Sequence, residues 1–251
     1  MIQSAAVNLG LIGFGRFGQF AARHLRTKLN LVVSDRLDLR KKAAAAGVAW
    51  GTIQEAASQE YVLLAVPISQ LPACLDSIVP HLRSGATLLD CCSVKVKPVE
   101  WMRERAPEDV EIVGLHPLFG PQSGRAGVAG LTVVLCPART TRSELFKGFL
   151  EEFGLVVHVM SPEEHDRTMA RTQALTQFLG RGLVLTGIED QAVKTPAFDR
   201  LFRMVEMVRH DSPELFKDMH RLNPYAAEER RRILEALLRL HRELDTPPAV
   251  E

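Results

Sequence analysis

The stretch that decides the fold is Leu9-Gly10-Leu11-Ile12-Gly13-Phe14-Gly15-Arg16-Phe17-Gly18. It joins an apolar, strand-like run over Val7–Ile12 to a helical pattern over Phe17–Arg26. Glycines at the spacing G-x-G-x-x-G between a strand and a helix are typical of a dinucleotide site, because they permit a tight turn, close approach of the pyrophosphate and close packing of the helix. We therefore predict that the loop binds a dinucleotide through Gly13, Phe14, Gly15, Arg16, Phe17 and Gly18.

Short apolar runs and helical patterns alternate along the next part of the chain. Several of the runs are apolar nearly throughout, as expected of parallel strands covered on both faces. Further strands are expected at Leu31–Val33, Tyr61–Val66, Thr87–Cys92, Glu111–Leu115, Leu131–Leu135 and Leu155–Met160. Further helices are expected at Leu37–Ala46, Ser69–Leu82, Val99–Arg105 and Ser143–Phe153. This alternation predicts an α/β fold with a Rossmann-type, doubly wound, mostly parallel sheet.

The chain changes character after Met160. Ser161-Pro162-Glu163-Glu164 is typical of a helix start, with a capping serine, a proline in the first turn and acidic residues at the positive end of the helix dipole. His165-Asp166 is interpreted as part of that first turn. Helices and no convincing strand follow, so we predict a dinucleotide-binding domain over 1–160 and an all-helical domain over 161–251. The last helix, Ala226–Leu244, has an apolar stripe that suits an intrachain core or a second subunit: Ile233, Leu237, Leu240 and Leu244.

The composition is that of an ordinary globular protein: 251 residues, 46% hydrophobic, with a formal net charge of +1. This charge gives no electrostatic reason to expect a nucleic acid or an anionic membrane as partner, and no apolar run reaches the roughly 20 residues of a membrane helix. Residues 1–6 lack the features of a signal peptide, so we expect a cytoplasmic protein. The cysteines lack the spacing of a zinc site, so we expect free thiols and no metal at Cys74, Cys91, Cys92 and Cys136.

A carboxylate follows the second expected strand, at Asp35 in Val33-Ser34-Asp35-Arg36. A carboxylate at this place accepts hydrogen bonds from the ribose hydroxyls and repels a 2′-phosphate, which favours NAD. Ser34 and Arg36 are able instead to hold that phosphate, so NADP stays open. The turn Val66-Pro67, at the end of another strand, is expected to lie against the ribose of the cofactor.

The loop Gly114–Gly124 carries His116 where an apolar strand runs into a segment rich in Gly and Pro. Ligands of open α/β sheets bind at the carboxyl ends of the strands. Ser93 follows the preceding strand, so Ser93 and His116 are expected at the same edge. An imidazole beside a hydroxyl suits removal of a proton from a substrate alcohol. Two alternatives stay open: a structural histidine in a stiff turn, and a nucleophilic serine, against which the lack of a G-x-S-x-G motif counts.

These features belong to a longer series of motifs. In chain order they are Gly13–Gly18, Ser93-Val94-Lys95, His116-Pro117-Leu118-Phe119-Gly120-Pro121, Glu164-His165-Asp166, Gln173-Ala174-Leu175-Thr176, and Leu215-Phe216 through Asn223-Pro224. Together they resemble the prephenate/arogenate dehydrogenases of tyrosine biosynthesis. The resemblance implies an enzyme that uses NAD, or NADP, for the oxidative decarboxylation of a small molecule, prephenate or arogenate, to 4-hydroxyphenylpyruvate or tyrosine. It also implies a homodimer formed through the helical domain.

The resemblance assigns roles to single residues. His116 would accept the proton of the substrate's ring hydroxyl as hydride passes to the nicotinamide. Ser93 would orient His116, contact the same hydroxyl and lie against the cofactor. The residues then expected to bind the substrate are Gln122, Ser123, Gln173, Gln177, Lys217 and Arg221.

Two positions depart from the family pattern. Many relatives have histidine where this chain has Gln177, which shares a helical face with Gln173 but cannot become cationic. Some members have an arginine near Lys217, which keeps the charge without the bidentate fork. Arg167 and Arg171 are further candidates for anion binding, with a solvated helix face or an interhelical ion pair as the alternative.

Two other functions stay open at this point. One is another nicotinamide-dependent dehydrogenase of small acids. The 3-hydroxyacid dehydrogenases share the two-domain plan but typically use a lysine on the helix after the sheet. This chain has no lysine between Met160 and Gly187, which counts against that function. The other is a catalytically silent dinucleotide sensor, which the loss of the family histidine at Gln177 keeps possible. The choice between prephenate and arogenate also stays open, as does a plastid-like compartment if a transit peptide was removed.

Overall fold

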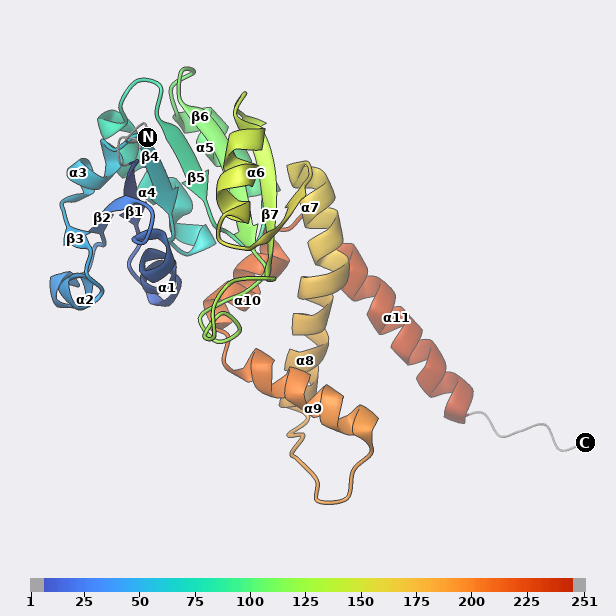
Figure 1. Cartoon of the computed structure of the whole chain (residues 1–251). Coiled ribbons are helices and arrows are strands. Elements are labelled where there is room, and N and C mark those ends of the chain that lie inside the picture. The colour runs from blue at the N-terminus through green and yellow to red at the C-terminus, as the bar shows by residue number, and fades with distance from the viewer. Residues whose placement is uncertain (1–6, 246–251) are drawn as a thin grey trace, which may run out of the picture. The chain divides into compact units, whose positions relative to one another are not determined.

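The computed structural model describes residues 7–245, so the prediction made for residues 1–6 lies outside the described residues. The chain divides into two compact units, Met1–His165 and Asp166–Glu251. The first unit contains the sheet and the second contains helices (Figure 1). The boundary falls inside a helix, α7 (Pro162–Met169), whose first turn belongs to the sheet unit.

Within the described residues, the sheet of the first unit has eight strands in the order β3-β2-β1-β4-β5-β6-β7-β8. Neighbouring strands from β3 to β6 pair in parallel, whereas β7 runs antiparallel to β6 and parallel to β8. The strands are β1 (Asn8–Ile12), β2 (Asn30–Ser34), β3 (Ala49–Trp50), β4 (Tyr61–Leu64), β5 (Thr87–Asp90), β6 (Glu111–Pro117), β7 (Thr132–Arg139) and β8 (Val156–Val159). The predicted mostly parallel, doubly wound sheet is confirmed.

Helices connect these strands: α1 (Arg16–Leu25), α2 (Arg40–Ala45), α3 (Ile53–Ala57), η1 (Ile68–Gln70), α4 (Leu71–Ile78), η2 (Val79–His81), α5 (Val96–Arg105) and α6 (Ser143–Glu151). The single helix expected over Ser69–Leu82 is divided into α4 and two flanking 3₁₀ turns. Two elements were not predicted. They are β3, which is two residues long, and α3, which is five residues long and begins with a capping box between Thr52 and Glu55.

A row of apolar side chains crosses the middle of the sheet and fixes its register. Val33, Leu11, Leu63, Leu89 and Val113 occupy successive register positions on β2, β1, β4, β5 and β6, and each is at most 6% exposed. Full burial of one such side chain stabilises a fold by about 1.5–3 kcal/mol. A slip of one residue on any strand would turn its member of the row to the other face.

At the opposite edge from the predicted site, where β4, β5 and β6 begin, one arginine ties three strands together. The Arg142 guanidinium donates to Glu111 Oε2 at 2.8 Å, to Thr87 Oγ1 at 2.7 Å and to the Tyr61 hydroxyl at 3.3 Å. Its charge also lies over the Tyr61 ring, 5.7 Å from the centroid. A planar guanidinium suits such a site because its donors point in fixed directions. Loss of this contact would release the amino ends of the three strands from one another. Because Arg142 acts at the amino ends, the carboxyl ends of the strands remain available for a ligand.

The antiparallel turn from β6 to β7 brings a long loop, residues 118–131, back to the edge from which it left. The loop closes where the Leu118 amide donates to the Thr132 carbonyl at 2.9 Å. It packs on α1: the Phe119 and Phe20 rings meet edge to face with centroids 6.1 Å apart. A Cβ on Gly124 would lie only 2.5 Å from the end of the Phe20 ring, so any other residue there would have to displace that ring. The loop is therefore held over α1, beside the glycine loop of β1.

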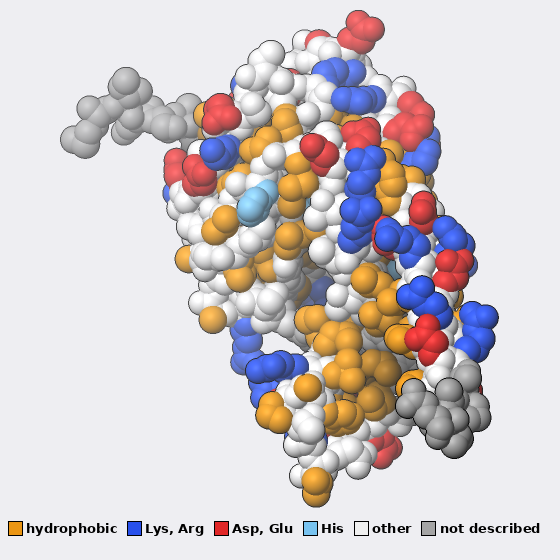
Figure 2. Space-filling view, turned by 90° about the vertical axis from the view of Figure 1, so that its right-hand side faces the viewer, with side chains coloured by type: hydrophobic (Ala, Val, Ile, Leu, Met, Phe, Trp, Pro, Cys, Tyr) orange, Lys and Arg blue, Asp and Glu red, His pale blue; other side chains and the backbone are white. Residues whose placement is uncertain are grey.

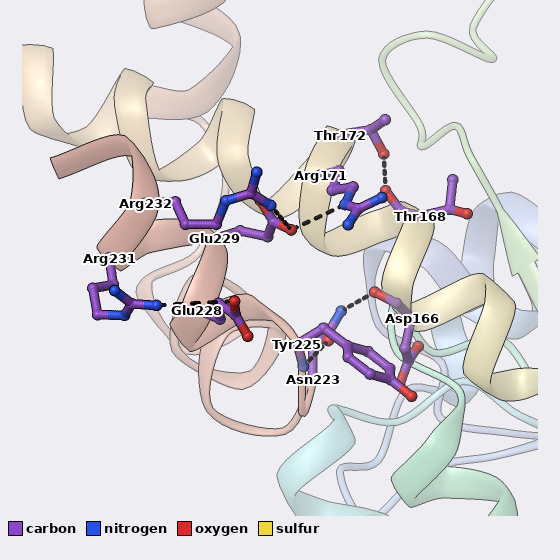
Figure 3. Close-up of polar contacts among 10 residues, drawn as sticks. All are labelled: Asp166, Thr168, Arg171, Thr172, Asn223, Tyr225, Glu228, Glu229, Arg231 and Arg232. Carbon is purple, nitrogen blue, oxygen red and sulfur yellow. Dashed lines mark hydrogen bonds and ion pairs between the residues drawn. The ribbon is translucent and has the colours of Figure 1, made fainter. Parts of the chain in front are cut away.

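The second unit continues α7 through a short π-helical segment, η3 (Ala170–Ala174), into α8 (Leu175–Leu185), followed by α9 (Pro196–Arg209), α10 (Pro213–Arg221) and α11 (Ala226–Asp245). No strand lies between residues 161 and 245, which confirms the helical prediction. Asn223 joins the start of α11 to α7: its Nδ2 donates to the Asp166 carbonyl at 2.8 Å, and its Oδ1 accepts from the Tyr225 amide at 2.9 Å (Figure 3).

Candidate active site

The glycine loop has the geometry that its spacing predicts. Gly13 has a φ of +98°, and its amide donates to the Ser34 carbonyl at 2.9 Å. A Cβ on Gly18 would lie 2.0 Å from the Gly13 carbonyl oxygen, so α1 packs against the turn as only glycine allows. Gly15, in contrast, has open space where its Cβ would be, which is the condition for a phosphate to approach the backbone.

A cavity of about 810 Å³ opens beside this loop, entirely within the sheet unit. Its lining includes the predicted residues Gly13, Gly15, Ser34, Asp35, Arg36, Val66 and Pro67. It also includes residues that the sequence analysis missed, among them Arg40, Trp50, Gly51, Thr52, Gln70 and Cys74. Three of these, Trp50, Gly51 and Thr52, lie on or beside β3 and α3, the two elements that were not predicted. The capping box Thr52–Glu55 was the readable signal for that region.

Asp35 links the end of β2 to the glycine loop. Its Oδ2 accepts a hydrogen bond from the Phe14 amide at 2.6 Å and its Oδ1 accepts one from the Leu37 amide at 2.9 Å. A carboxylate oxygen has two lone pairs, so both oxygens retain capacity to accept from ribose hydroxyls. The side chains that surround the cavity therefore fit a dinucleotide.

His116 lies in β6 itself, one residue before the strand ends, rather than in the loop that follows. Its side chain is 2% exposed, and its Nδ1 is 2.8 Å from Nε2 of His165. Burial lowers the pKa of His116 well below 6.5, because the charged ring would lose its solvation; the neighbouring His165 and the Lys95 ammonium act in the same direction. The ring is thus kept neutral, the form in which an imidazole accepts a proton.

Ser93 lies three positions beyond the end of β5, and Asp90 pairs with Gly114 in the β5–β6 register. Ser93 and His116 are therefore at the same edge of the sheet. Among the described residues, the half-buried Ser93 hydroxyl has no hydrogen-bond partner, so its predicted roles toward His116, the cofactor and the substrate stay predictions. The ring contact of His116 is made by His165, which the sequence analysis interpreted only as part of a helix start.

A buried ion pair lies behind His116. Lys95 and Asp90 are both fully buried; Lys95 Nζ contacts Asp90 Oδ2 and donates to the Leu115 carbonyl at 2.7 Å. Burial acts to lower the pKa of Lys95, but the Asp90 carboxylate outweighs it and the pKa is raised above its usual value. A Cβ on Gly114 would lie 3.0 Å from Cδ of Lys95, so the glycine leaves room for the lysine stem. This pair joins the end of β5 to the residue before His116.

The predicted substrate residues of the loop are both exposed. Ser123 closes a turn: its Oγ accepts from the Gly120 amide at 3.0 Å. Gln122 lies beside it in the same turn.

In the helical unit, Gln173 lies in the π-helical segment and Gln177 on α8, where the Gln177 amide donates to the Asp211 carboxylate. The side-chain oxygen of each glutamine is buried without a partner among the described residues. Lys217 and Arg221 are exposed on α10. The structure does not test these four as substrate ligands, and they stay predictions.

The other two anion-binding candidates of this unit already have partners. Arg171 donates to Glu229 of α11 at 2.9 Å, and that carboxylate also contacts Arg232 (Figure 3). The Arg167 guanidinium lies over the Tyr225 ring, 4.8 Å from its centroid. For Arg171 the structure therefore agrees with the alternative interpretation, an interhelical ion pair.

Residues 7–245 contain no group of three or more His, Cys, Asp or Glu side chains able to hold a metal ion. In the same range no helix is both long and apolar enough to cross a bilayer. The four cysteines are free thiols.

Comparison with known proteins agrees with this site. The prephenate dehydrogenase nucleotide-binding domain matches residues 21–159, and a TYRAAT1-like C-terminal domain matches residues 183–249. Arogenate dehydrogenase 2 of Arabidopsis thaliana, described as chloroplastic, is 30% identical over 96% of this chain and 71% of its own length. A probable arogenate/prephenate dehydrogenase of Methanocaldococcus jannaschii is 29% identical over 86% of this chain and 52% of its own.

The crystal structure of a prephenate dehydrogenase from A. aeolicus, solved with hydroxyphenyl propionate and NAD+, has the same fold, with a TM-score of 0.76 at 21% identity over 96% of this chain and 92% of that one. The chain spans 71% of the length of the Arabidopsis relative but only about half of the archaeal one. The nucleotide-binding match alone covers more than half of the sequence. The chain therefore belongs to the prephenate/arogenate dehydrogenase family of oxidoreductases.

Proposed function

We propose that this chain catalyses the NAD(P)-dependent oxidative decarboxylation of prephenate or arogenate, giving 4-hydroxyphenylpyruvate or tyrosine. The observation that carries the proposal is His116, a neutral, buried imidazole at the carboxyl edge of the sheet that also holds the glycine loop. The names of the relatives indicate the reaction, and His116 is a group able to perform the proton transfer that this reaction requires.

The protein has to bind and orient the substrate and to accept one proton from it. With Nδ1 of His116 in contact with His165, the nitrogen left for the substrate hydroxyl is Nε2. A nicotinamide cofactor held by the glycine loop would supply the acceptor for the hydride from the carbon that bears this hydroxyl. The carbon–carboxylate bond then breaks, its electron pair makes the ring aromatic, and the proton returns from Nε2 to the oxygen. Because aromatisation drives the sequence forward, positioning and one proton transfer are what the protein must supply.

The direct test is cofactor reduction, followed by nicotinamide absorbance, with prephenate and arogenate each offered with NAD and NADP. We expect reduction in at least one of the four mixtures, with release of carbon dioxide in equal amount. No reduction in any mixture, by protein shown to bind the cofactor, would contradict the proposal and leave the dinucleotide sensor as the better interpretation.

We propose NAD as the preferred cofactor, because the Asp35 carboxylate lies at the cavity wall and would repel a 2′-phosphate. Asp35→Ser is expected to lower kcat/KM with NAD and raise it with NADP, since Arg36 and Arg40 line the same cavity. The ratio of the two values should move toward NADP by about 10-fold, the usual size of one lost charge repulsion near a surface. Asp109→Ser, at an exposed residue that does not line the cavity, is the control. An unchanged ratio would remove Asp35 as the discriminator.

We propose a homodimer formed through the helical unit. The apolar stripe of α11 does not close a core within the described residues, since Leu237, Leu240 and Leu244 are 47%, 52% and 85% exposed. Hydrophobic side chains also gather in the lower half of Figure 2. Sedimentation velocity should give twice the chain mass, and Leu237→Glu/Leu240→Glu should give the monomer. A monomeric wild type at concentrations used for the activity assay would contradict this.

For the compartment, we propose the cytoplasm or a plastid-like organelle; the Arabidopsis relative is described as chloroplastic.

A further inference from the structure

Two buried histidines from distant parts of the sheet unit contact each other. His116 of β6 and His165 of α7 are 2% and 0% exposed, and the facing atoms, Nδ1 of His116 and Nε2 of His165, are 2.8 Å apart. Their ring planes make an angle of 66°. Two ring nitrogens at this distance need one proton between them, because two bare or two protonated nitrogens repel each other. One histidine therefore donates and the other accepts.

The direction of this hydrogen bond decides whether His116 can act as a base. A neutral imidazole carries one proton. If His116 donates from Nδ1, its Nε2 is bare and can take a proton from a substrate. If His116 accepts at Nδ1, its proton is on Nε2 and the ring cannot serve as the base. The base role thus requires His165 to be the acceptor.

The first turn of α7 holds His165 in place for this contact. The Ser161 amide and hydroxyl donate to Glu164 Oε2, each at 2.9 Å, and the Glu164 amide donates to Ser161 Oγ at 3.2 Å. The His165 amide then donates to the Ser161 carbonyl at 3.0 Å. Such reciprocal capping fixes the start of a helix, so the His165 ring projects from a rigid turn.

Other charged groups also act on His116. Lys95, the residue before α5, donates to the Leu115 carbonyl next to His116 and is paired with Asp90 of β5. The lysine charge disfavours a second positive charge nearby. With His165 as a neutral acceptor, His116 is therefore positively charged only while it holds the extra proton taken from the substrate.

We propose that His165 is a positioning residue, which accepts the hydrogen bond from Nδ1 of His116 and so keeps Nε2 free for the substrate proton. This inference rests on the proposed function of His116 as the base. When Nε2 takes up the proton, the Nδ1–H bond to His165 persists and shares the positive charge of the ring. The substrate O–H bond breaks, the Nε2–H bond forms, and His165 gains and loses nothing.

The test compares three variants with the wild type. His165→Leu removes the acceptor, whereas His165→Gln places an amide oxygen where Nε2 stands. His158→Leu is the matched control, because His158 is exposed on β8. We expect His165→Leu to lower kcat roughly 10- to 100-fold, the effect of a buried donor left without its partner, with KM changed less than about twofold. His165→Gln should recover most of the loss, and His158→Leu should equal the wild type.

A second measurement does not depend on turnover. Nitrogen-15 NMR of labelled histidine distinguishes the two tautomers, and in the wild type His116 should carry its proton on Nδ1. His165→Leu should give a mixture, while circular dichroism and cofactor binding stay unchanged if the variant folds. An Nε2-protonated His116 in the wild type, or undiminished kcat in folded His165→Leu, would overturn the inference. If the wild type turns over neither substrate, the proposed function fails, and the NMR result still decides the tautomer.

Discussion

His116→Asn is expected to lower kcat by about 10²- to 10⁴-fold, the usual contribution of a positioned acid or base. The asparagine amide nitrogen takes the place of Nδ1 and keeps a donor toward His165, but nothing replaces Nε2. Cofactor binding should be unchanged, because the glycine loop and its cavity do not include residue 116. Steady-state kinetics together with cofactor titration check both statements, with His158→Asn as the exposed control. Unchanged turnover would remove His116 from the base role.

The wild-type pH profile follows from the same residue. Burial and the neighbouring positive charge lower the pKa of His116 below 6.5. Neutral His116 is the active form, so kcat/KM should be constant above that pKa and fall tenfold per pH unit below it. The acid limb is therefore expected below pH 6.5, and it should vanish from the residual activity of His116→Asn. An acid limb above pH 6.5 that belongs to His116 would contradict the burial argument.

Lys95→Met is expected to lower the free energy of unfolding of the sheet unit by about 3–5 kcal/mol, because it leaves the Asp90 carboxylate buried without its partner. The methionine fills most of the volume of the lysine stem, so the loss is mainly electrostatic. Lys95→Met/Asp90→Leu should recover most of the stability, since a buried ion pair is worth little more than apolar side chains of similar volume.

Urea unfolding checks this prediction in the correct part of the chain. The two tryptophans, Trp50 and Trp101, both lie in the sheet unit, so their fluorescence reports its unfolding alone. Lys97→Met is the control: its partner Glu100 is 45% exposed, and such pairs contribute about 0–1 kcal/mol. Equal losses in Lys95→Met and Lys97→Met would show that the buried pair has no special role.

What was predictable from the sequence had short-range causes. The glycine loop could be predicted because Gly13, Gly15 and Gly18 act within one turn, and the strands because apolar runs of three or more residues leave a pattern. In contrast, β3 has two residues and α3 five, too few for any periodicity. For this reason the part of the cavity wall formed by Trp50 and Thr52 was not predicted either.

The contacts around His116 were less predictable because they join residues far apart in the chain. His165 is 49 positions away from it, and nothing local distinguishes a histidine in a helix start from a partner of the base. Lys95 was recognised only as a member of the motif Ser93-Val94-Lys95, with no role of its own, and a lysine is seldom expected to be buried. Its burial depends on Asp90 and on the missing side chain at Gly114, which meet only when β5 and β6 pair.

The loop 118–131 leaves the sheet at Pro117 and returns at Thr132, and one hydrogen bond closes its base. Insertions are therefore easiest to accommodate in the parts of the loop away from its contacts with α1 at Phe119 and Gly124. Each doubling of such a loop costs only about 0.6 kcal/mol of closure entropy, and no insertion there shifts the pairing of β6, in which His116 is already seated. A change in the length of this loop would thus alter what stands above the carboxyl edge of the sheet, while His116 and His165 keep their contact.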